Sequence, residues 1–451
     1  MGWNRIRWRV SLLIAVVLGA LLRPGAPLAA PSPTAIWTER AYHYQSMPLR
    51  FGLALALDGT TLVSGGGGYP SHSEYGVVHV FERDQGGPNS WGWLQRLDPP
   101  EDSTDSRVSN FGRAVALGGG TLVVGDPGRD VIHFYARDPA TRRWSLQSSL
   151  ESPVSPTYGA YGFGHPLVIQ GDILAVGGTG KVYVYRRSAA EPTGWRVSGT
   201  LEYDPLQPRN AQFGASIAIR PDPSGEGNDR ILVGAPCMAY RTITCAGSAQ
   251  LFTANQGRPE WLHLATLTPA NGASGDQFGA AVAFADQRLI VGAPGTDITG
   301  QARPYADVGA VYIFGPVTGG WAQLQRLTSP TLAWEAAFGR SLAVEGQLLV
   351  VGAPRESYVN EQGFAVQGAV YGFDRNRGGP DAWGLLKRQL GSRFEDRDTY
   401  GSALAIQNGT LAVGTGNADR PSFGLTYVYS IVWAEPPPPL PTLTPRLPQL
   451  P

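Results

Sequence analysis

The chain has 451 residues, of which 42% are hydrophobic and 16% are charged. Lys plus Arg and Asp plus Glu both number 36, so the formal net charge is zero at pH 7. A neutral chain has no overall field that would draw it to nucleic acid or to an acidic membrane surface, and we expect neither as a partner. Glycine (59 residues) and proline (37 residues) are abundant. The glycines recur at regular intervals, which indicates many turns rather than disorder.

Residues 1–30 have the pattern of an export signal. Arginines within Arg5–Arg9 precede a short apolar run, Ser11–Leu22, and small residues follow as far as Ala29 and Ala30. The apolar run is shorter than the roughly 20 residues that span a bilayer, and no later stretch is long and apolar enough. We therefore expect a secreted or cell-surface protein with no transmembrane segment in the mature chain. The alternative is an uncleaved anchor, because the small residues do not form a clean A-x-A cleavage site.

An internal repeat dominates the rest of the chain. Phe-Gly or Tyr-Gly opens a short apolar segment seven times, at intervals of 50 to 65 residues. Such self-similarity is typical of repeat folds, in which neighbouring units bury one another's faces. The pairs are Phe51-Gly52, Phe111-Gly112, Phe163-Gly164, Phe213-Gly214, Phe278-Gly279, Phe338-Gly339 and Tyr400-Gly401.

Each repeat divides into four segments of strand length. The first contains alanine, as in Ala114–Leu117, and the second is β-branched and ends in glycine, as in Thr121–Gly125. The third alternates apolar and aromatic residues, as in Val77–Phe81, and the fourth starts with tryptophan, as in Trp93–Leu97. Gly, Pro and Asp separate the segments, and no helical period is found. The pattern predicts an all-β, seven-bladed β-propeller with four antiparallel strands in each blade.

The ends of the repeat array predict how the ring closes. Ile36–Arg40 resembles a fourth strand with no blade of its own, and the last repeat ends near Trp433 after its third strand. We expect the N-terminal strand to complete the last blade and so remove an open edge. The propeller then covers residues 31–434. Residues 435–451 are proline-rich and are predicted to form an extended spacer.

The repeat resembles the FG-GAP repeat of the integrin α N-terminal propeller and of many secreted bacterial proteins. The motif runs from Phe338-Gly339 to Gly352-Ala-Pro354, and Gly-Ala-Pro is also intact at 234–236 and 292–294. It is degraded at 65–67, 125–127, 177–179 and 414–416. The resemblance implies extracellular recognition of a protein or another ligand and no catalytic chemistry.

Integrin-like propellers also carry calcium loops, and one turn here approaches that pattern. Asp222, Ser224 and Glu226 fall at the first ligand positions, with Asn228 and Asp229 close behind. These oxygen ligands suit Ca²⁺, but the final ligand position holds Arg230, a cation. We expect no cofactor. The alternative at this turn is a single weak calcium ion.

The only two cysteines, Cys237 and Cys245, are close in the sequence of an exported chain. A disulfide across one loop is expected, with two free thiols as the alternative. Their C-x₇-C spacing fits neither a zinc site nor a redox motif.

The connections between second and third strands should emerge on the same face as the connections between blades. They are long in blades 4–6 and short in blades 2 and 3, so this loop face is predicted to be uneven and to hold the ligand site. The alternative for its aromatic residues is packing of loops against the blades. The aromatic candidates are Tyr69, Tyr75, Tyr240, Tyr305, Trp334 and Tyr358.

No catalytic motif accompanies this scaffold: H-E-x-x-H, G-x-S-x-G and phosphate loops are missing from the sequence. We therefore predict a non-catalytic binding or adhesion module for an extracellular protein or glycan. The alternatives are a carbohydrate-active propeller, either a glycan hydrolase or lectin-like, and a structural surface protein.

Overall fold

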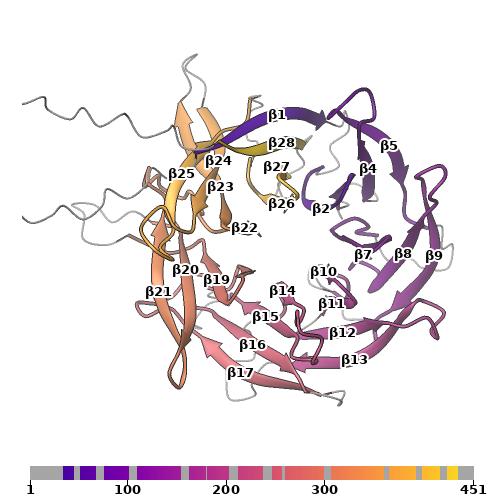
Figure 1. Cartoon of the computed structure of the whole chain (residues 1–451), viewed down its shortest axis with the longest axis horizontal. Helices are drawn as coiled ribbons and strands as arrows, with labels where there is room; N and C mark the ends of the chain where they lie inside the picture. The colour runs from indigo at the N-terminus through magenta and orange to yellow at the C-terminus, as the bar shows by residue number, and fades with distance from the viewer. Residues whose placement is uncertain are drawn as a thin grey trace, which may run out of the picture. The chain divides into compact units, whose positions relative to one another are not determined.

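A computed structural model gives the architecture of the chain (Figure 1). It describes residues 34–44, 51–67, 76–100, 109–153, 162–178, 180–202, 212–236, 246–255, 260–298, 306–359, 365–392, 399–416 and 424–434. Ala35–Val432 forms one compact unit. The predicted export signal and the proline-rich tail lie outside the described residues. Among the residues described, no helix is long and apolar enough to cross a membrane.

Seven four-stranded sheets follow one another around the ring, which confirms the predicted all-β propeller. Within a blade each strand pairs with the next, and the first strands surround the centre in Figure 1. Blades 1 to 4 are β2 (Ala54–Asp58), β3 (Thr61–Gly66), β4 (Val77–Arg83) and β5 (Trp91–Leu97); β6 (Ala114–Gly118), β7 (Thr121–Asp126), β8 (Val131–Arg137) and β9 (Trp144–Glu151); β10 (Leu167–Gln170), β11 (Ile173–Gly178), β12 (Lys181–Arg187) and β13 (Trp195–Glu202); and β14 (Ser216–Arg220), β15 (Arg230–Ala235), β16 (Ser248–Ala254) and β17 (Trp261–Leu267).

Blades 5 and 6 are β18 (Ala281–Ala285), β19 (Arg288–Ala293), β20 (Ala310–Val317) and β21 (Gly320–Thr328); and β22 (Ser341–Glu345), β23 (Leu348–Val359), β24 (Ala365–Asp374) and β25 (Gly384–Gln389). Blade 7 is β26 (Ala403–Gln407), β27 (Thr410–Gly414), β28 (Leu425–Ala434) and, at its outer edge, β1 (Thr34–Tyr44). The predicted closure by the N-terminal strand is therefore confirmed. A short apolar run of Leu, Val, Ile or Ala in each second strand suits a position covered on both faces by the neighbouring blades.

A tryptophan lies at the start of the fourth strand in blades 1 to 6, and its side chain is buried in blades 1, 2, 3 and 6. In blade 1 this residue is Trp91, which is 5% exposed, whereas Trp93 is 54% exposed. The prediction that the strand begins at Trp93 was therefore wrong by two residues. Trp91 pairs with Arg83, whereas Trp93 pairs with Phe81, next to the register shift between Val80 and Phe81.

The hydrophobic core lies between blades rather than inside them. Val123 of blade 2 packs in one cluster with Leu174 and Val176 of blade 3, and Val428 of blade 7 packs with Leu62 of blade 1. The aromatic residue of each Phe-Gly pair adds an edge contact within its own blade. For example, the Phe278 and Tyr312 rings are 5.5 Å apart and meet edge to face. Such pairs stabilise by about 0.5–1.5 kcal/mol beyond their buried area.

A glycine-to-glycine approach joins the blades near the axis. Gly339 of blade 6 donates its N–H to the Gly352 carbonyl in its own blade at 3.0 Å. The carbonyl of Gly339 faces Gly292 of blade 5, where an added Cβ would lie 2.0 Å from the oxygen. Six of the seven blade boundaries have this approach, with Cβ-to-oxygen distances of 2.0–2.2 Å. The pairs are Gly65 with Gly112, Gly125 with Gly164, Gly234 with Gly279, Gly292 with Gly339, Gly352 with Gly401, and Gly414 with Gly52.

This contact explains which part of the motif is retained in the degraded copies. The repeats at 65–67, 125–127 and 414–416 have lost Ala, Pro or both, but each keeps its first glycine. Alanine and proline are replaceable at these positions, whereas any side chain on that glycine would meet a carbonyl oxygen of the next blade. The first glycine is therefore the residue that the ring geometry requires.

We predict that Gly292→Ala strongly destabilises the propeller, since the new methyl group would collide with a backbone that cannot move without separating two blades. The matched control is Gly86→Ala, where nothing lies within 4 Å but φ is +97°. That control should cost only about 1–2 kcal/mol of conformational strain. Chemical denaturation measures both values. A Gly292→Ala cost no larger than that of Gly86→Ala would contradict the glycine contact.

The ring closure depends on Trp37 of β1. Its side chain is 7% exposed, and its ring occupies the space beside Gly372 of blade 6, where a Cβ would lie only 2.7 Å from the indole. The Lys387 ammonium lies 5.7 Å from the centre of the same ring. Arg40 donates to the Ser430 hydroxyl at 2.8 Å and joins β1 to β28. The closing strand is thus held by its own blade and by the blade before it.

We predict that Trp37→Ala costs about 3–5 kcal/mol of unfolding free energy, the usual value for removing a buried tryptophan. Ile36→Ala is the matched control, since Ile36 is the neighbouring residue and is 56% exposed.

Removal of residues 31–45 should expose the edge of β28 and cause aggregation. Size-exclusion chromatography and thermal melting provide the readouts. A soluble truncated chain that melts like the intact protein would refute closure by β1.

Candidate functional site

Two faces of the ring carry connections, and the antiparallel pairing assigns each connection to its face. The loop face carries the connections from second to third strands and from one blade to the next. The opposite face carries the turns between first and second strands and between third and fourth strands. Among the described residues, the loop face differs in height between blades 2 and 6. In blade 2 only residues 127–130 join β7 to β8, whereas in blade 6 the β23–β24 ladder continues to Val359 and Ala365.

The blade 6 hairpin is anchored by a buried carboxylate. The Glu356 side chain is 1% exposed, and it accepts hydrogen bonds from the Tyr371 hydroxyl at 2.6 Å and from the Arg388 guanidinium at 2.6 Å. Ser329, in the connection to the preceding blade, also donates to it at 3.4 Å. A buried charge that is paired and hydrogen-bonded holds its surroundings in one arrangement. The base of the hairpin is therefore fixed to the blade.

A second buried carboxylate anchors the loop face between blades 1 and 2. Asp126 accepts the Ser109 hydroxyl at 2.8 Å and the Asn110 N–H at 2.6 Å. Burial raises the pKa of Asp126, and these hydrogen bonds act in the opposite direction. The carboxylate thus links a second strand to the connection that enters its own blade.

Trp334 is the loop-face candidate whose side chain the structure describes most clearly. It is 63% exposed and lies in the connection between β21 and β22. Backbone hydrogen bonds join the residues after Trp334 to the β19–β20 connection, from Glu335 N–H to Ala306 at 3.0 Å and from Ala337 N–H to Asp307 at 3.0 Å. Trp334 is therefore a large apolar side chain presented to solvent on a fixed backbone.

Tyr358 lies in β23, where only its backbone is described. The remaining predicted residues of the loop face and the predicted disulfide lie outside the described residues, and those predictions stay open. They are Tyr69, Tyr75, Tyr240, Tyr305, Cys237 and Cys245.

The predicted calcium turn joins β14 to β15 on the opposite face. Asp222 accepts the backbone N–H groups of Asn228 and Ser224, both at 3.0 Å, and the Ser224 hydroxyl at 2.8 Å. These donors, the Asn228 N–H first, lower the pKa of Asp222 to about 2. Asp229 pairs with Arg186 of blade 3 and accepts the Asp222 N–H at 2.8 Å. Both carboxylates are thus occupied by protein donors.

Glu226 and the Asn228 amide complete the residues predicted for calcium, and both are exposed. Within the described ranges, no group of three or more His, Cys, Asp or Glu residues is placed to hold a metal ion. The weak calcium site stays a prediction that only an ion-binding measurement decides.

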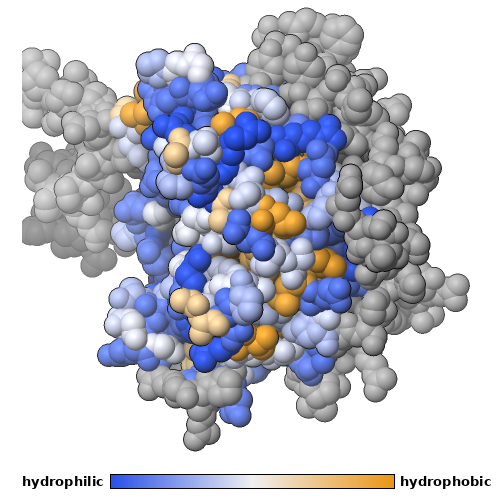
Figure 2. Space-filling model, turned by 90° about the vertical axis from the view of Figure 1, so that its right-hand side faces the viewer, coloured by the Kyte–Doolittle hydropathy of each residue, from blue (hydrophilic) through white to orange (hydrophobic). Residues whose placement is uncertain are grey.

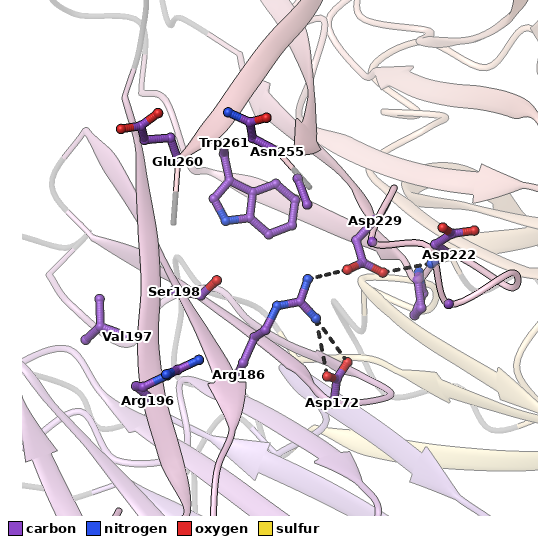
Figure 3. Close-up of a pocket in the computed structure, with 14 residues that line it drawn as sticks. Asp172, Arg186, Arg196, Val197, Ser198, Asp222, Asp229, Asn255, Glu260 and Trp261 are labelled. Carbon is purple, nitrogen blue, oxygen red and sulfur yellow. Dashed lines mark hydrogen bonds and ion pairs between the residues drawn. The ribbon is translucent and has the colours of Figure 1, made fainter. Parts of the chain in front are cut away.

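A groove of about 700 Å³ lies beside this turn, between blades 3 and 4 (Figure 3). Figure 3 shows the Arg186 guanidinium between two carboxylates, Asp229 and Asp172, with the Trp261 indole nearby. The distance from Arg186 to Asp172 is 3.2 Å. Arg196 and Ser198 of β13 line the side of the groove formed by blade 3. A smaller groove of about 310 Å³ lies on the other side of the turn and contains Trp321.

The sequence pattern alone did not identify this groove. It singled out Asp222 and Asp229 only as candidate calcium ligands, and the structure places them in one groove with Arg186 and Trp261 of other strands. The available signal was a departure from the repeat. Ala254 stands where the first three blades have Arg83, Arg137 and Arg187, each paired with the tryptophan of the fourth strand.

The outer rim presents isolated hydrophobic side chains among polar ones, and Figure 2 shows separate hydrophobic patches on the side that faces the viewer. Fourth strands contribute one or two such residues per blade in blades 1 to 6, each 41–60% exposed. They are Trp93, Leu146, Val197, Leu262, Leu264, Leu324 and Leu385. Scattered apolar residues of this kind are ordinary surface features, so the rim is not assigned a binding role.

Residues 261–314 match the family model of the FG-GAP repeat. This chain contains an FG-GAP repeat. The matched FG-GAP segment begins at the fourth strand of blade 4 and ends in the third strand of blade 5, so it includes one blade boundary. Together with seven four-stranded blades, the FG-GAP match is consistent with a propeller like that of integrin α chains. No curated protein matches the chain.

We predict that calcium leaves the melting temperature unchanged, because the carboxylates of the turn are already occupied by N–H groups and by Arg186. Asp222→Ala should lower the melting temperature to the same extent with calcium and with chelator, since it removes an acceptor for three donors. Glu226→Ala is the control on the same turn and should have no effect. A calcium-dependent rise in melting temperature that Asp222→Ala abolishes would instead establish the ion site.

Proposed function

We propose that the protein is a secreted or cell-surface, non-catalytic binding module whose loop face recognises an extracellular protein or glycan. The observation that carries this proposal is Trp334, a tryptophan exposed on a connection that backbone hydrogen bonds fix in place. Exposed aromatic residues on rigid loops supply binding area at a low entropic cost. FG-GAP repeats are typical of extracellular proteins, and this supports the proposed location.

The uneven loop face adds to this support. The blade 6 hairpin and the Trp334 connection are neighbours on the ring, because Ser329 of that connection donates to Glu356 in the hairpin. On the same face, the connections of blades 2 and 3 are short, so the surface is lower there. A partner with a shape complementary to this uneven surface would contact Trp334 and the hairpin together.

The buried histidines support a role without catalysis. His79 and His133 have pKa values lowered to about 4, because burial disfavours the charged imidazolium. They contact neighbouring side chains, as in the 3.1 Å hydrogen bond from the Trp93 indole to His79. Such residues act as packed core groups. A carbohydrate-directed role remains the second candidate, favoured by the groove beside Trp261.

We predict that Trp334→Ala weakens binding to a partner captured from extracellular or surface extracts by about tenfold or more, as expected for a central aromatic contact. Trp93→Ala is the matched control, since Trp93 is also an exposed tryptophan but lies on the outer rim. Both variants should retain the wild-type melting temperature within a few degrees. Equal binding by wild type and Trp334→Ala would exclude this loop from the recognition surface.

A further inference from the structure

The groove between blades 3 and 4 exists because two covering side chains are missing there. In blades 1 and 5, a fourth-strand glutamine clasps the backbone of the next blade's tryptophan. Gln95 donates to the Trp144 carbonyl at 2.9 Å and accepts its N–H at 2.8 Å, and Gln325 does the same for Trp383. The pairing of strands places Gly199 at the equivalent position in blade 3. No clasp therefore reaches Trp261 from that position.

The second missing cover is the arginine of the third strand. Arg187 in blade 3 lies 4.6 Å from the centre of the Trp195 ring and donates to Thr121 of the preceding blade at 3.0 Å. Its guanidinium thus fills the space between blades 2 and 3. The residue paired with Trp261 in the same way is Ala254, which is too short to reach across. A half-buried indole is left at the wall of an open groove.

The polar groups of the groove are held in place before any ligand arrives. Arg186 is fixed between Asp172 and Asp229, and Asp229 is fixed in turn by the N–H of Asp222. Asp222 is held by donors of its own turn. A preorganised lining reduces the entropy lost on binding. At about 700 Å³, the groove is also within the range of small-molecule sites, about 300–1,000 Å³.

Other polar groups in the groove have no partner among the described residues. The Arg196 guanidinium, the Asn255 amide and the Glu260 carboxylate line the groove, and none of them makes a side-chain hydrogen bond there. They offer donors and acceptors at the edge of the tryptophan (Figure 3). A ligand that both donates and accepts hydrogen bonds would satisfy all three.

The charges of the lining select against an anion. Four carboxylates (Asp172, Asp222, Asp229 and Glu260) face two guanidiniums (Arg186 and Arg196). Arg186 and backbone N–H groups already neutralise or occupy three of those carboxylates. These contacts leave few free carboxylate oxygens for a cation. The lining still has two more carboxylates than guanidiniums, and this excess of negative charge disfavours acidic ligands. An uncharged ligand rich in hydroxyl groups, with one apolar face for the indole, fits best.

We propose that this groove binds an uncharged saccharide, with one pyranose ring stacked on Trp261 and its hydroxyl groups bonded to Arg196, Asn255 and Glu260. The apolar C–H face of the sugar would cover the exposed part of the indole, while hydroxyl groups both donate to the carboxylate and accept from the guanidinium. The site lies on the face opposite the loop face. It therefore goes beyond the recognition proposed for Trp334 and can hold whether or not that recognition does.

The test begins with the intact mature protein and a panel of uncharged oligosaccharides of glucose, mannose, galactose or N-acetylglucosamine. Sulfated and uronate oligosaccharides of similar length form the acidic panel. We expect binding to at least one uncharged oligomer, measured by calorimetric titration, and weaker binding to the acidic panel. Absence of binding to every uncharged oligomer, or binding to the acidic panel or a basic peptide alone, overturns the proposal.

Two variants locate the binding. Trp261→Ala should weaken it by about tenfold through loss of the stacked ring, and Trp93→Ala, on the rim, should leave it unchanged. Ala254→Arg rebuilds the side chain that covers the tryptophan in blade 3 and should also close the site, with no loss of melting temperature. This second variant keeps the test valid if Trp261→Ala fails to fold. Wild-type affinity in folded Ala254→Arg protein refutes the site.

Trp334→Ala separates this proposal from the loop-face function. That variant should bind the oligosaccharide as the wild type does, because Trp334 lies on the other face. A loss of saccharide binding in Trp334→Ala together with full binding in Ala254→Arg would move the saccharide to the loop face and overturn the groove assignment.

Discussion

The close approach of two glycines at the blade boundary is the constraint on which the ring depends. In six of the seven blades the glycine of the Phe-Gly or Tyr-Gly pair donates its N–H to its own second strand, and at six boundaries the carbonyl of this glycine faces the second-strand glycine of the preceding blade. This contact brings the inner ends of two sheets closer than any side chain would allow. The hydrophobic core can then form between blades, where apolar second strands are covered on both sides.

The boundary between blades 3 and 4 departs from this arrangement. Gly177 of blade 3 has its closest neighbours in its own blade, at Pro166 and His165, rather than in Gly214 of blade 4. The outer part of the same boundary lacks the glutamine clasp and the covering arginine, and the groove of about 700 Å³ lies there. A repeat protein distributes its stability over similar interfaces, so one interface can specialise while the others hold the ring closed.

The two faces of the propeller therefore have different physical characters. On the loop face, buried carboxylates such as Glu356 and Asp126 tie connections to the blades, and backbone hydrogen bonds hold the connection that exposes Trp334. On the opposite face, short turns leave space between strands, and charged side chains hold one another around an indole. Both arrangements are rigid, which lets a ring built from short strands present precise surfaces.

The sequence by itself determined the architecture. Seven Phe-Gly pairs, four strand-like segments after each, and an unpartnered Trp37 segment predicted the number of blades and the closing strand, because these features are local and repeat along the chain. Even the degraded motifs kept the glycine that the ring requires.

Only the tertiary structure decided where the groove lies. Asp172, Arg186, Asp229 and Trp261 come from four different strands or turns of two blades, and their meeting depends on how those blades are packed. The residues of the turn at Asp222 left open a polar turn or a weak calcium site, and sequence spacing cannot show that Arg186 pairs with Asp229 there. Gly199 and Ala254 stand where other blades have larger residues. Only the tertiary structure shows that these small residues leave Trp261 uncovered.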